Sequence, residues 1–281
     1  MKYWSSAFLL LIGSNLFVWS AIVLDLSDTA WLKLYFLDVG QGDSELIDLP
    51  EGGRILIDGG PGKEASFQLA KVLRPTDRYI DLVVLTHAEK DHLGGLKDIL
   101  ARHKVGAFLW NGADAESDAW TELKNVLAGK NVPAVQVKAG DSITQGSSVI
   151  QIISPDEAPS DSAGKNEQSL VILLASESIR ALYPGDIGIA TERILLDTNE
   201  LDADILKIAH HGSRFSTGVE FLDEVSPAIA VIEVGKNNYG HPHPVTLQKL
   251  AALGISPYRT DIHGTVSLLI QDGKIGVRTE K

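Results

Sequence analysis

The chain has 281 residues, of which 44% are hydrophobic and 22% are charged, so it holds enough apolar material for a sizeable globular core. Its formal net charge of −12 at pH 7 argues against nucleic-acid binding through a generally basic surface. It contains no cysteine, which excludes disulfides and thiolate metal cages.

The first 30 residues contain a long stretch without charge. Residues 7–24 carry no charged side chain, and as a helix they would extend about 27 Å, close to the thickness of a bilayer core. Lys2 precedes this stretch and Asp25 and Asp28 follow it, a bias that would leave the rest of the chain outside the cytoplasm. We expect residues 1–30 to be a membrane anchor, with a cleaved signal segment or a buried amphipathic helix as alternatives.

From residue 31 onward, strand-like and helix-like segments alternate. The predicted strands lie, in chain order, at residues 32–38, 44–49, 54–58, 80–85, 105–110, 132–137, 149–153, 169–175, 179–183, 203–209, 228–233, 264–270 and 274–278. The predicted helices lie at residues 64–73, 92–102, 115–128, 189–197, 217–225 and 244–253, and a loop is predicted at 154–167. We therefore expect residues 31–281 to form one compact α/β domain in which helices cover two sheets.

The segment THAEKDH, directly after the predicted buried strand at 80–85, has the highest density of metal-binding side chains. It places His87, Glu89, Asp91 and His92 within six residues. Imidazole suits zinc, manganese and iron, whereas carboxylates favour harder ions, so the mixture predicts a catalytic divalent ion with open coordination positions. Neither a strand nor a helix would turn all four side chains to one side, so we expect a loop. The alternative is a polar turn in which Asp91 caps the following helix.

Acids and histidines also follow other apolar runs. Asp58, Asp186 and the pair His210 and His211 each stand at or shortly after the end of a predicted strand. Such side chains can meet in one crevice, where Asp186 would be a carboxylate that bridges two ions, or otherwise a turn residue. Of the two histidines, we expect one to bind metal and the other to face the sheet or a supporting acceptor.

Two further segments are expected to border this crevice. YGHPHP, at residues 239–244, is predicted to be a rim loop whose prolines leave His241 and His243 able to contact substrate or protonate a leaving oxygen. Its alternative is a proline-stiffened helix start. LDVGQGD, at residues 37–43, has alternating glycines that would let the backbone pass close to the crevice, with Asp43 supporting the site.

Six blocks of the sequence occur in a characteristic order. They are FLDVGQGDS at 36–44, LTHAEKDHLGG at 85–95, NEQS at 166–169, GD at 185–186, HHGS at 210–213 and NYGHPHP at 238–244. Together they resemble the metallo-β-lactamase-fold hydrolase domain of ComEC-type competence proteins. The resemblance covers essentially residues 31–281, and it implies an αββα sandwich with metal at one edge.

The resemblance also implies a set of site residues. The implied metal ligands are His87, Glu89, Asp91, His92, Asp186 and His210 or His211. The residues expected to support them or to contact substrate are Asp43, Asp58, Asn166, Ser169, Ser213 and Asn238. Many superfamily members have a further histidine before the aspartate that corresponds to Asp186, but here only His103 intervenes, in the helix after the cluster, where we expect it on the surface. One of the two metal positions is therefore expected to be the poorer one.

These residues predict a hydrolase that uses one or two divalent ions, Zn²⁺ or Mn²⁺. Two ions about 3.5–4 Å apart would clamp a phosphoryl group and activate a water for in-line attack, with Asp91 orienting the nucleophile. Glu89 could favour manganese over zinc. The resemblance implies a membrane-anchored phosphodiesterase, a nuclease that acts on DNA outside the cytoplasm. Because a single apolar segment at 7–24 does not make a channel, DNA transport would need a separate membrane channel protein.

Two other functions stay open at this point. The same ions could serve the hydrolysis of small esters, thioesters or lactams, because the fold does not decide the substrate. A reduced ligand set could also leave a metal-binding module that holds DNA or a partner without hydrolysis.

Overall fold

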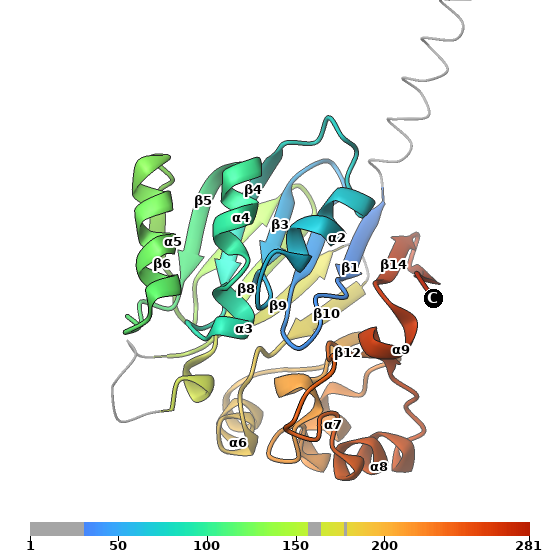
Figure 1. Ribbon diagram of the computed structural model, residues 1–281. Helices are drawn as coiled ribbons and strands as arrows, with labels where there is room; N and C mark the ends of the chain where they lie inside the picture. Colours follow the sequence, from blue (N-terminus) through green and yellow to red (C-terminus); the bar gives the residue numbers. More distant parts are fainter. Residues whose placement is uncertain (1–30, 157–163, 177–178) are drawn as a thin grey trace, which may run out of the picture.

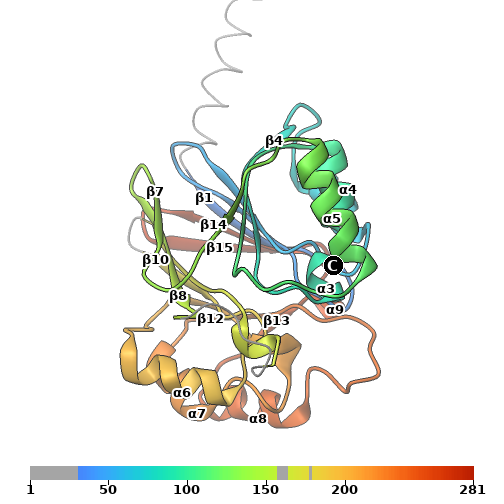
Figure 2. The same cartoon turned by 90° about the vertical axis from the view of Figure 1, so that its left-hand side faces the viewer.

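We describe residues 31–156, 164–176 and 179–281 of a computed structural model. These residues form four layers, in which two sheets pack face to face and helices cover both outer faces (Figures 1 and 2). This is the αββα sandwich that the sequence predicts. The anchor or signal segment predicted at residues 1–30 lies outside the described residues, as do residues 157–163 of the predicted loop. No helix in the described part of the chain is long and apolar enough to cross a membrane.

The first sheet has eight strands in the order β15-β14-β1-β2-β3-β4-β5-β6. Its strands are β1 (Leu32–Phe36), β2 (Glu45–Asp48), β3 (Arg54–Ile57), β4 (Tyr79–Leu85), β5 (Lys104–Trp110), β6 (Ala134–Gln136), β14 (Val266–Gln271) and β15 (Lys274–Thr279). Strands β3 to β6 run parallel, and the other neighbours are antiparallel. The carboxyl ends of the parallel strands therefore lie at one edge of the sheet.

The second sheet has seven strands in the order β13-β12-β11-β10-β9-β8-β7. Its strands are β7 (Ser142–Gln145), β8 (Ser148–Ser154), β9 (Val171–Ser176), β10 (Ile179–Tyr183), β11 (Ile205–Lys207), β12 (Ile229–Ile232) and β13 (Tyr258–Arg259). Strands β10 to β13 run parallel, whereas β7 to β10 are antiparallel. The strands predicted at residues 169–175 and 179–183 correspond to β9 and β10, which pair antiparallel.

Helices cover each sheet on its outer face (Figures 1 and 2). Over the first sheet lie α2 (Glu64–Val72), α3 (Lys90–Leu93), α4 (Leu96–Arg102) and α5 (Asp118–Gly129). Over the second sheet lie α6 (Ile189–Thr198), α7 (Val219–Val225) and α8 (Pro244–Ala252). The short helix α9 (Thr260–His263) and 3₁₀ turns at Asn166–Gln168 and Ala209–Gly212 complete the described elements.

Alternation along the strands sends successive side chains into different layers. In β4, Val84 packs between the two sheets, whereas Val83 and Leu85 pack under the helices of the first sheet. Apolar residues of both sheets form the central core, and two more cores lie under the outer helices. Burial on both faces explains why β4 ends in the continuous apolar run of residues 82–85, which reaches the site at its carboxyl end.

The predicted helix at 92–102 is instead divided into α3 and α4 by Gly94 and Gly95. A Cβ on Gly95 would lie 2.2 Å from the carbonyl oxygens of both Gly59 and Gly62. The glycine therefore lets the loop after β3 pass directly against the start of α4, and a continuous helix does not form. Periodicity also gives no sign of the short elements β7, β13 and α9, which span only two to four residues each.

Candidate metal centre

The predicted ligand and supporting residues follow neighbouring strands at one edge of the sandwich. Most of them lie in loops, whereas Asp91 and His92 lie in the short helix α3, where their spacing predicts a loop. Asp58 follows β3, His87 follows β4, Asp186 follows β10, and the pair His210 and His211 follows β11. Parallel strands place such loops side by side at their carboxyl ends. Groups that are distant in the sequence are therefore brought to one cleft between the two halves of the chain.

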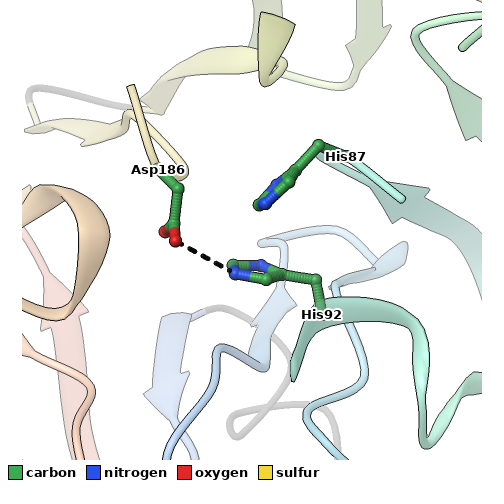
Figure 3. Close-up of side chains that lie close together, drawn as sticks. All are labelled: His87, His92 and Asp186. Atoms are coloured by element: carbon green, nitrogen blue, oxygen red, sulfur yellow. Dashed lines mark ion pairs between the residues drawn. The ribbon is translucent and has the colours of Figure 1, made fainter. Parts of the chain in front are cut away.

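His87, His92 and Asp186 form a buried group (Figure 3). Their ligand atoms all lie within 4.8 Å of one another, and His92 Nε2 is 3.4 Å from Asp186 Oδ2. His87 comes from the loop after β4, His92 from α3, and Asp186 from the turn after β10 in the second sheet. The two sheets thus contribute to the same site.

Two more side chains, Asp91 and His211, form a four-residue arrangement with His92 and Asp186. His211 Nε2 lies 3.5 Å from Asp91 Oδ2 and 3.5 Å from Asp186 Oδ2. In a tetrahedral site with metal–ligand bonds of about 2.1 Å, neighbouring ligand atoms are about 3.4 Å apart. The Nε2 atoms of His92 and His211 are buried and have no hydrogen-bond partner. Asp91, His92, Asp186 and His211, here called the inner position, therefore fit a divalent ion.

The remaining predicted ligands, His87, Glu89 and His210, are here called the outer position. His87 Nε2 is buried without a hydrogen-bond partner, so it too is available to an ion. Glu89 lines the cleft but belongs to none of the groups whose ligand atoms come together among the described residues. His210 Nε2 lies 3.8 Å from Asp186 Oδ2 and 3.4 Å from Asn166 Nδ2. The outer position is therefore the less complete of the two.

The adjacent histidines differ in how they are held. His211 is buried, and its Nδ1 lies 3.0 Å from Glu233 O and 3.1 Å from Asp43 Oδ1, which leaves Nε2 to face the ion position. The His210 side chain is 29% exposed. Both residues have positive φ, 50° and 52°, and both line the cleft. The turn after β11 thus brings both rings to the cleft, and that one of them binds metal while the other contacts a supporting acceptor stays a prediction.

Asp58 supports the histidines of the first sheet. Its carboxylate accepts from His92 Nδ1 at 2.7 Å, from the Thr86 hydroxyl at 2.6 Å and from the Thr86 N–H at 2.8 Å. Because the Thr86 hydroxyl donates to Asp58, its oxygen is free to accept from His87 Nδ1, 3.0 Å away. One buried carboxylate therefore fixes the ring orientation of His92 directly and of His87 through Thr86.

Asp43 supports His211 from the opposite side. The backbone passes close at this point, because a Cβ on Gly42 would lie only 2.3 Å from Asp91 O. The Asp43 carboxylate forms an ion pair with the buried ammonium of Lys207 and contacts His211 Nδ1. Burial would raise the Asp43 pKa, but Lys207 and His211 lower it below its ordinary value. Asp43 therefore stays ionised, in the supporting role that the sequence predicts.

The charges around the inner position favour ionised carboxylates and protonated imidazoles. Burial would lower the pKa of His92 and His211, but the acids around them raise the pKa of His92 well above its usual value and that of His211 to about 10. Burial would raise the Asp186 pKa, yet His211 and His92 lower it well below its usual range. A divalent cation would take the place of these imidazole protons.

Sequence reasoning missed a buried group behind Asp43. Lys207 lies near Glu45 and Glu233, both fully buried. Burial and the repulsion between these two carboxyls raise the pKa of Glu45 well above its usual value, and burial together with Asp43 raises that of Glu233 to about 8. The pair therefore keeps a shared proton at neutral pH. A sequence signal exists, since Lys207 interrupts the apolar run ILKIA.

Ser169, Asn166 and Ser213 have different positions relative to the cleft. Ser169 Oγ accepts from the Asp186 N–H at 3.3 Å and donates to Asn166 O at 2.7 Å, so it holds the turn that carries Asp186. Ser213 is buried, and its Oγ accepts from the Phe215 N–H, so it holds the turn after His211 rather than facing the cleft.

The histidine expected to lie on the surface, His103, is instead buried at the end of α4. Its Nδ1 lies 3.2 Å from Ile99 O. Among the described residues it belongs to no group that could hold a metal. It therefore does not replace the missing histidine of the outer position.

The cleft in front of the ion position has a volume of about 1080 Å³. It is lined by Gln41, Pro61, Ala88, Glu89, Lys90, Asp91, Ser117, Asp118, Ala119, Lys165, Asp186, His210, His211, Lys236, Asn237, Asn238, Tyr239 and His241. Both halves of the sandwich contribute, and exposed lysines stand on both sides. The cleft is large enough for a substrate much bigger than a single phosphate.

The two histidines of the YGHPHP segment have different positions and different contacts. His241 lines the cleft, and burial together with His210 and His211 lowers its pKa to about 4, so it is neutral at neutral pH. His243 is not among the residues that line the cleft. It is the N-cap residue of α8, where its Nδ1 accepts from the Val245 N–H and Pro244 occupies the first helical position. The predicted catalytic role for His243 is therefore replaced by a helix-capping one, which was the structural alternative.

Fold and site together define a metallohydrolase-type sandwich with a candidate divalent-metal centre at its edge. The family model described as Beta-lactamase superfamily domain matches residues 53–232. The chain therefore belongs to the β-lactamase superfamily, and its resemblance to the ComEC-like branch is confirmed by its relatives.

The relatives include proteins named for competence. The chain is 34% identical over 249 residues to ComE operon protein 3 of Bacillus subtilis, covering 82% of this chain and 32% of that protein. It is 27% identical over 248 residues to competence protein ComA of Neisseria gonorrhoeae, covering 87% of this chain and 33% of that protein. The chain thus spans about a third of the length of these curated relatives.

Among solved structures, the fold is similar to that of Igni18, a metallo hydrolase from Ignicoccus hospitalis. The TM-score is 0.57 at 16% sequence identity, with 86% of this chain and all of that chain covered. At this identity the likeness concerns the fold alone. It agrees with the two-sheet architecture described above.

Proposed function

We propose that this protein is a divalent-metal-dependent phosphodiesterase, a nuclease that acts on DNA. The observation that supports it most is the inner position, where four side chains from both sheets converge and each imidazole is backed by a buried carboxylate. Supporting residues of this kind are typical of ion sites rather than of polar turns. The competence relatives favour DNA over small esters, thioesters or lactams as the substrate.

A divalent ion held by Asp91, His92, Asp186 and His211 would supply the Lewis acidity that activates water and stabilises charge on a phosphoryl oxygen. His87 and Asp186 would hold a second ion of the same kind, Zn²⁺ or Mn²⁺. Asp91 is 31% exposed in its side chain, and its outer oxygen can orient a water in the cleft. His241 is neutral and can donate a hydrogen bond to the leaving oxygen.

The surface charge of the cleft is compatible with a polyanion even though the whole chain is acidic. Lys90, Lys165 and Lys236 are exposed and line the cleft. A divalent ion would neutralise Asp91 and Asp186, so the three lysines would outnumber the other two lining acids, Glu89 and Asp118. Lysine contacts of this kind position a phosphodiester backbone without reading its sequence.

We further propose that residues 1–30 anchor the domain at residues 31–281 to a membrane, with the hydrolase outside the cytoplasm. The uncharged stretch at 7–24 supports this proposal. A separate membrane channel protein would be the partner if the substrate is DNA in transit.

The test is cleavage of labelled single-stranded DNA by the purified protein with added Mn²⁺ or Zn²⁺, beside a chromogenic lactam and a thioester. We expect DNA cleavage that is lost in Asp91→Ala and Asp186→Ala and kept in Asp118→Ala, the matched control in the same cleft. Turnover of the lactam or thioester alone would contradict the proposal. Metal-dependent DNA binding without turnover would instead support a non-hydrolytic binding module.

A further inference from the structure

The most exposed large apolar side chain of the described residues stands at the cleft. Tyr239 is 74% exposed and lines the cleft in front of the inner position. Aromatic rings dominate interface energetics when they find a partner, and leaving one in water forfeits that gain. An aromatic ring held open beside a reaction centre is therefore a candidate ligand platform.

The loop that carries the Tyr239 ring is held in place by hydrogen bonds from one side chain. Asn237 Oδ1 accepts from the N–H groups of Tyr239, Gly240 and His241, each at 3.0 Å. Asn237 Nδ2 donates to Gly235 O and His241 O, each at 2.8 Å. The Asn237 side-chain amide thus fixes five backbone groups of this loop. Because the backbone that carries the Tyr239 ring is held in place, little conformational entropy is lost when a ligand binds.

The ring lies at the end of a row of aromatic rings that leads into the site. Tyr239 and His241 have centroids 5.8 Å apart and planes inclined by 33°. His241 in turn lies 5.5 Å from the His210 ring and 6.4 Å from the His211 ring. A flat group resting on Tyr239 would therefore lie beside a phosphodiester whose phosphorus sits at the ion position.

Cationic and amide groups flank the same ring. Lys236 and Asn238 are exposed neighbours that also line the cleft, and Lys90 and Lys165 stand among the other lining residues. Lysines along a groove with an aromatic ring among them are the combination that binds single-stranded nucleic acid, because every base offers a face for stacking. A duplex keeps its bases stacked on one another and offers no free face.

We infer that Tyr239 is the stacking platform for an unpaired nucleobase adjacent to the phosphodiester that is cleaved. The inference rests on the proposed function and specifies its substrate as single-stranded, or locally unpaired, nucleic acid. Stacking tolerates any base, so the subsite would select for an exposed base rather than for a sequence.

The test compares two short single-stranded oligonucleotides of equal charge, one with bases and one made of abasic residues. Binding is measured by fluorescence anisotropy without added metal, and KM and kcat are measured with Mn²⁺. The variants are Tyr239→Ala, Tyr239→Phe and Phe215→Ala. Phe215 is the matched control, because it is 65% exposed but does not line the cleft.

We expect Tyr239→Ala to weaken binding of the base-bearing oligonucleotide roughly tenfold and to raise KM similarly, with little change in kcat. Tyr239→Phe and Phe215→Ala should match the wild type. The abasic oligonucleotide should bind the wild type and Tyr239→Ala equally.

Three results would overturn the inference: unchanged binding in Tyr239→Ala, an equal loss with the abasic oligonucleotide, or no binding of either oligonucleotide by the wild type. Tyr239-dependent binding without hydrolysis would support the platform and contradict the nuclease. The two proposals can therefore fail separately.

Discussion

The inner and outer positions of the metal centre differ in what surrounds their ligands. At the inner position, His92 is backed by Asp58 and His211 by Asp43, and both acids are buried. At the outer position, His87 is oriented by Thr86, and the His210 side chain is partly exposed. Among the described residues, Glu89 belongs to none of the groups whose ligand atoms lie close together. The identity of the ligand residues therefore does not by itself decide which of two adjacent positions binds an ion more tightly. The buried partners behind the ligands favour a tight first ion and a weaker second one.

The two neighbouring histidines after β11 give the strongest test of the difference between the inner and outer positions. We expect His211→Ala to lower the affinity for the first ion by at least roughly 100-fold, since it removes a ligand and not just a supporting partner. His210→Ala, the matched control one residue away, should change it by about fivefold or less because its side chain is partly exposed. Isothermal titration with Mn²⁺ measures both, and equal losses would contradict the assignment.

The support behind His211 is the next target. Asp43→Asn should lower the affinity for the first ion roughly 10- to 100-fold. It also leaves the Lys207 ammonium buried without its partner, which should cost about 3 kcal/mol of folding stability. The double variant with Lys207→Met should regain stability in urea but not metal affinity. Recovery of both would mean that Asp43 acts on folding alone.

The affinity for metal should also depend on pH. The pKa values of His92 and His211 are raised, so these imidazoles hold protons at neutral pH that an ion has to displace, whereas the lowered pKa of Asp186 keeps that carboxylate ionised. Affinity should therefore rise with pH, about tenfold per unit for each proton released, between pH 6 and 8. Titration calorimetry in buffers of different ionisation enthalpy counts these protons, and a pH-independent affinity would contradict the arrangement.

The smallest effect is expected at Glu89. Among the described residues, the Glu89 carboxylate belongs to none of the groups whose ligand atoms could share an ion. Glu89→Gln should therefore change the affinity for the first ion by about fivefold or less. Any larger effect should fall on the second ion, which a two-site titration separates. A loss as large as that in His211→Ala would remove the distinction between the positions.

The sequence predicts the site best where ligands are contiguous. His87, Asp91 and His92 follow one apolar strand, so their spacing alone indicates a shared site at its end, although Asp91 and His92 lie in the short helix α3 and not in a loop. Asp186 and His211 are also predicted, because strand ends converge in parallel sheets. The pairing of Asp43 with Lys207 joins residues 164 positions apart and leaves no local pattern.

Other features escape prediction for local reasons. His243 and His241 look alike in a Pro-rich segment, but only one can cap the helix that begins at Pro244. The helix break at Gly94 and Gly95 depends on how closely another loop approaches, which periodicity does not record. Charged residues inside apolar runs, such as Lys207, are the signal that could have identified the buried support.

The central claim is that a divalent ion is held between His92, His211, Asp91 and Asp186. The most direct measurement is a crystal structure of the protein with Mn²⁺, located by its anomalous scattering. We expect the strongest peak at bonding distance from His92 Nε2 and His211 Nε2, with any weaker second peak beside His87. A single peak at His87 and Glu89, with none at His211, would contradict it.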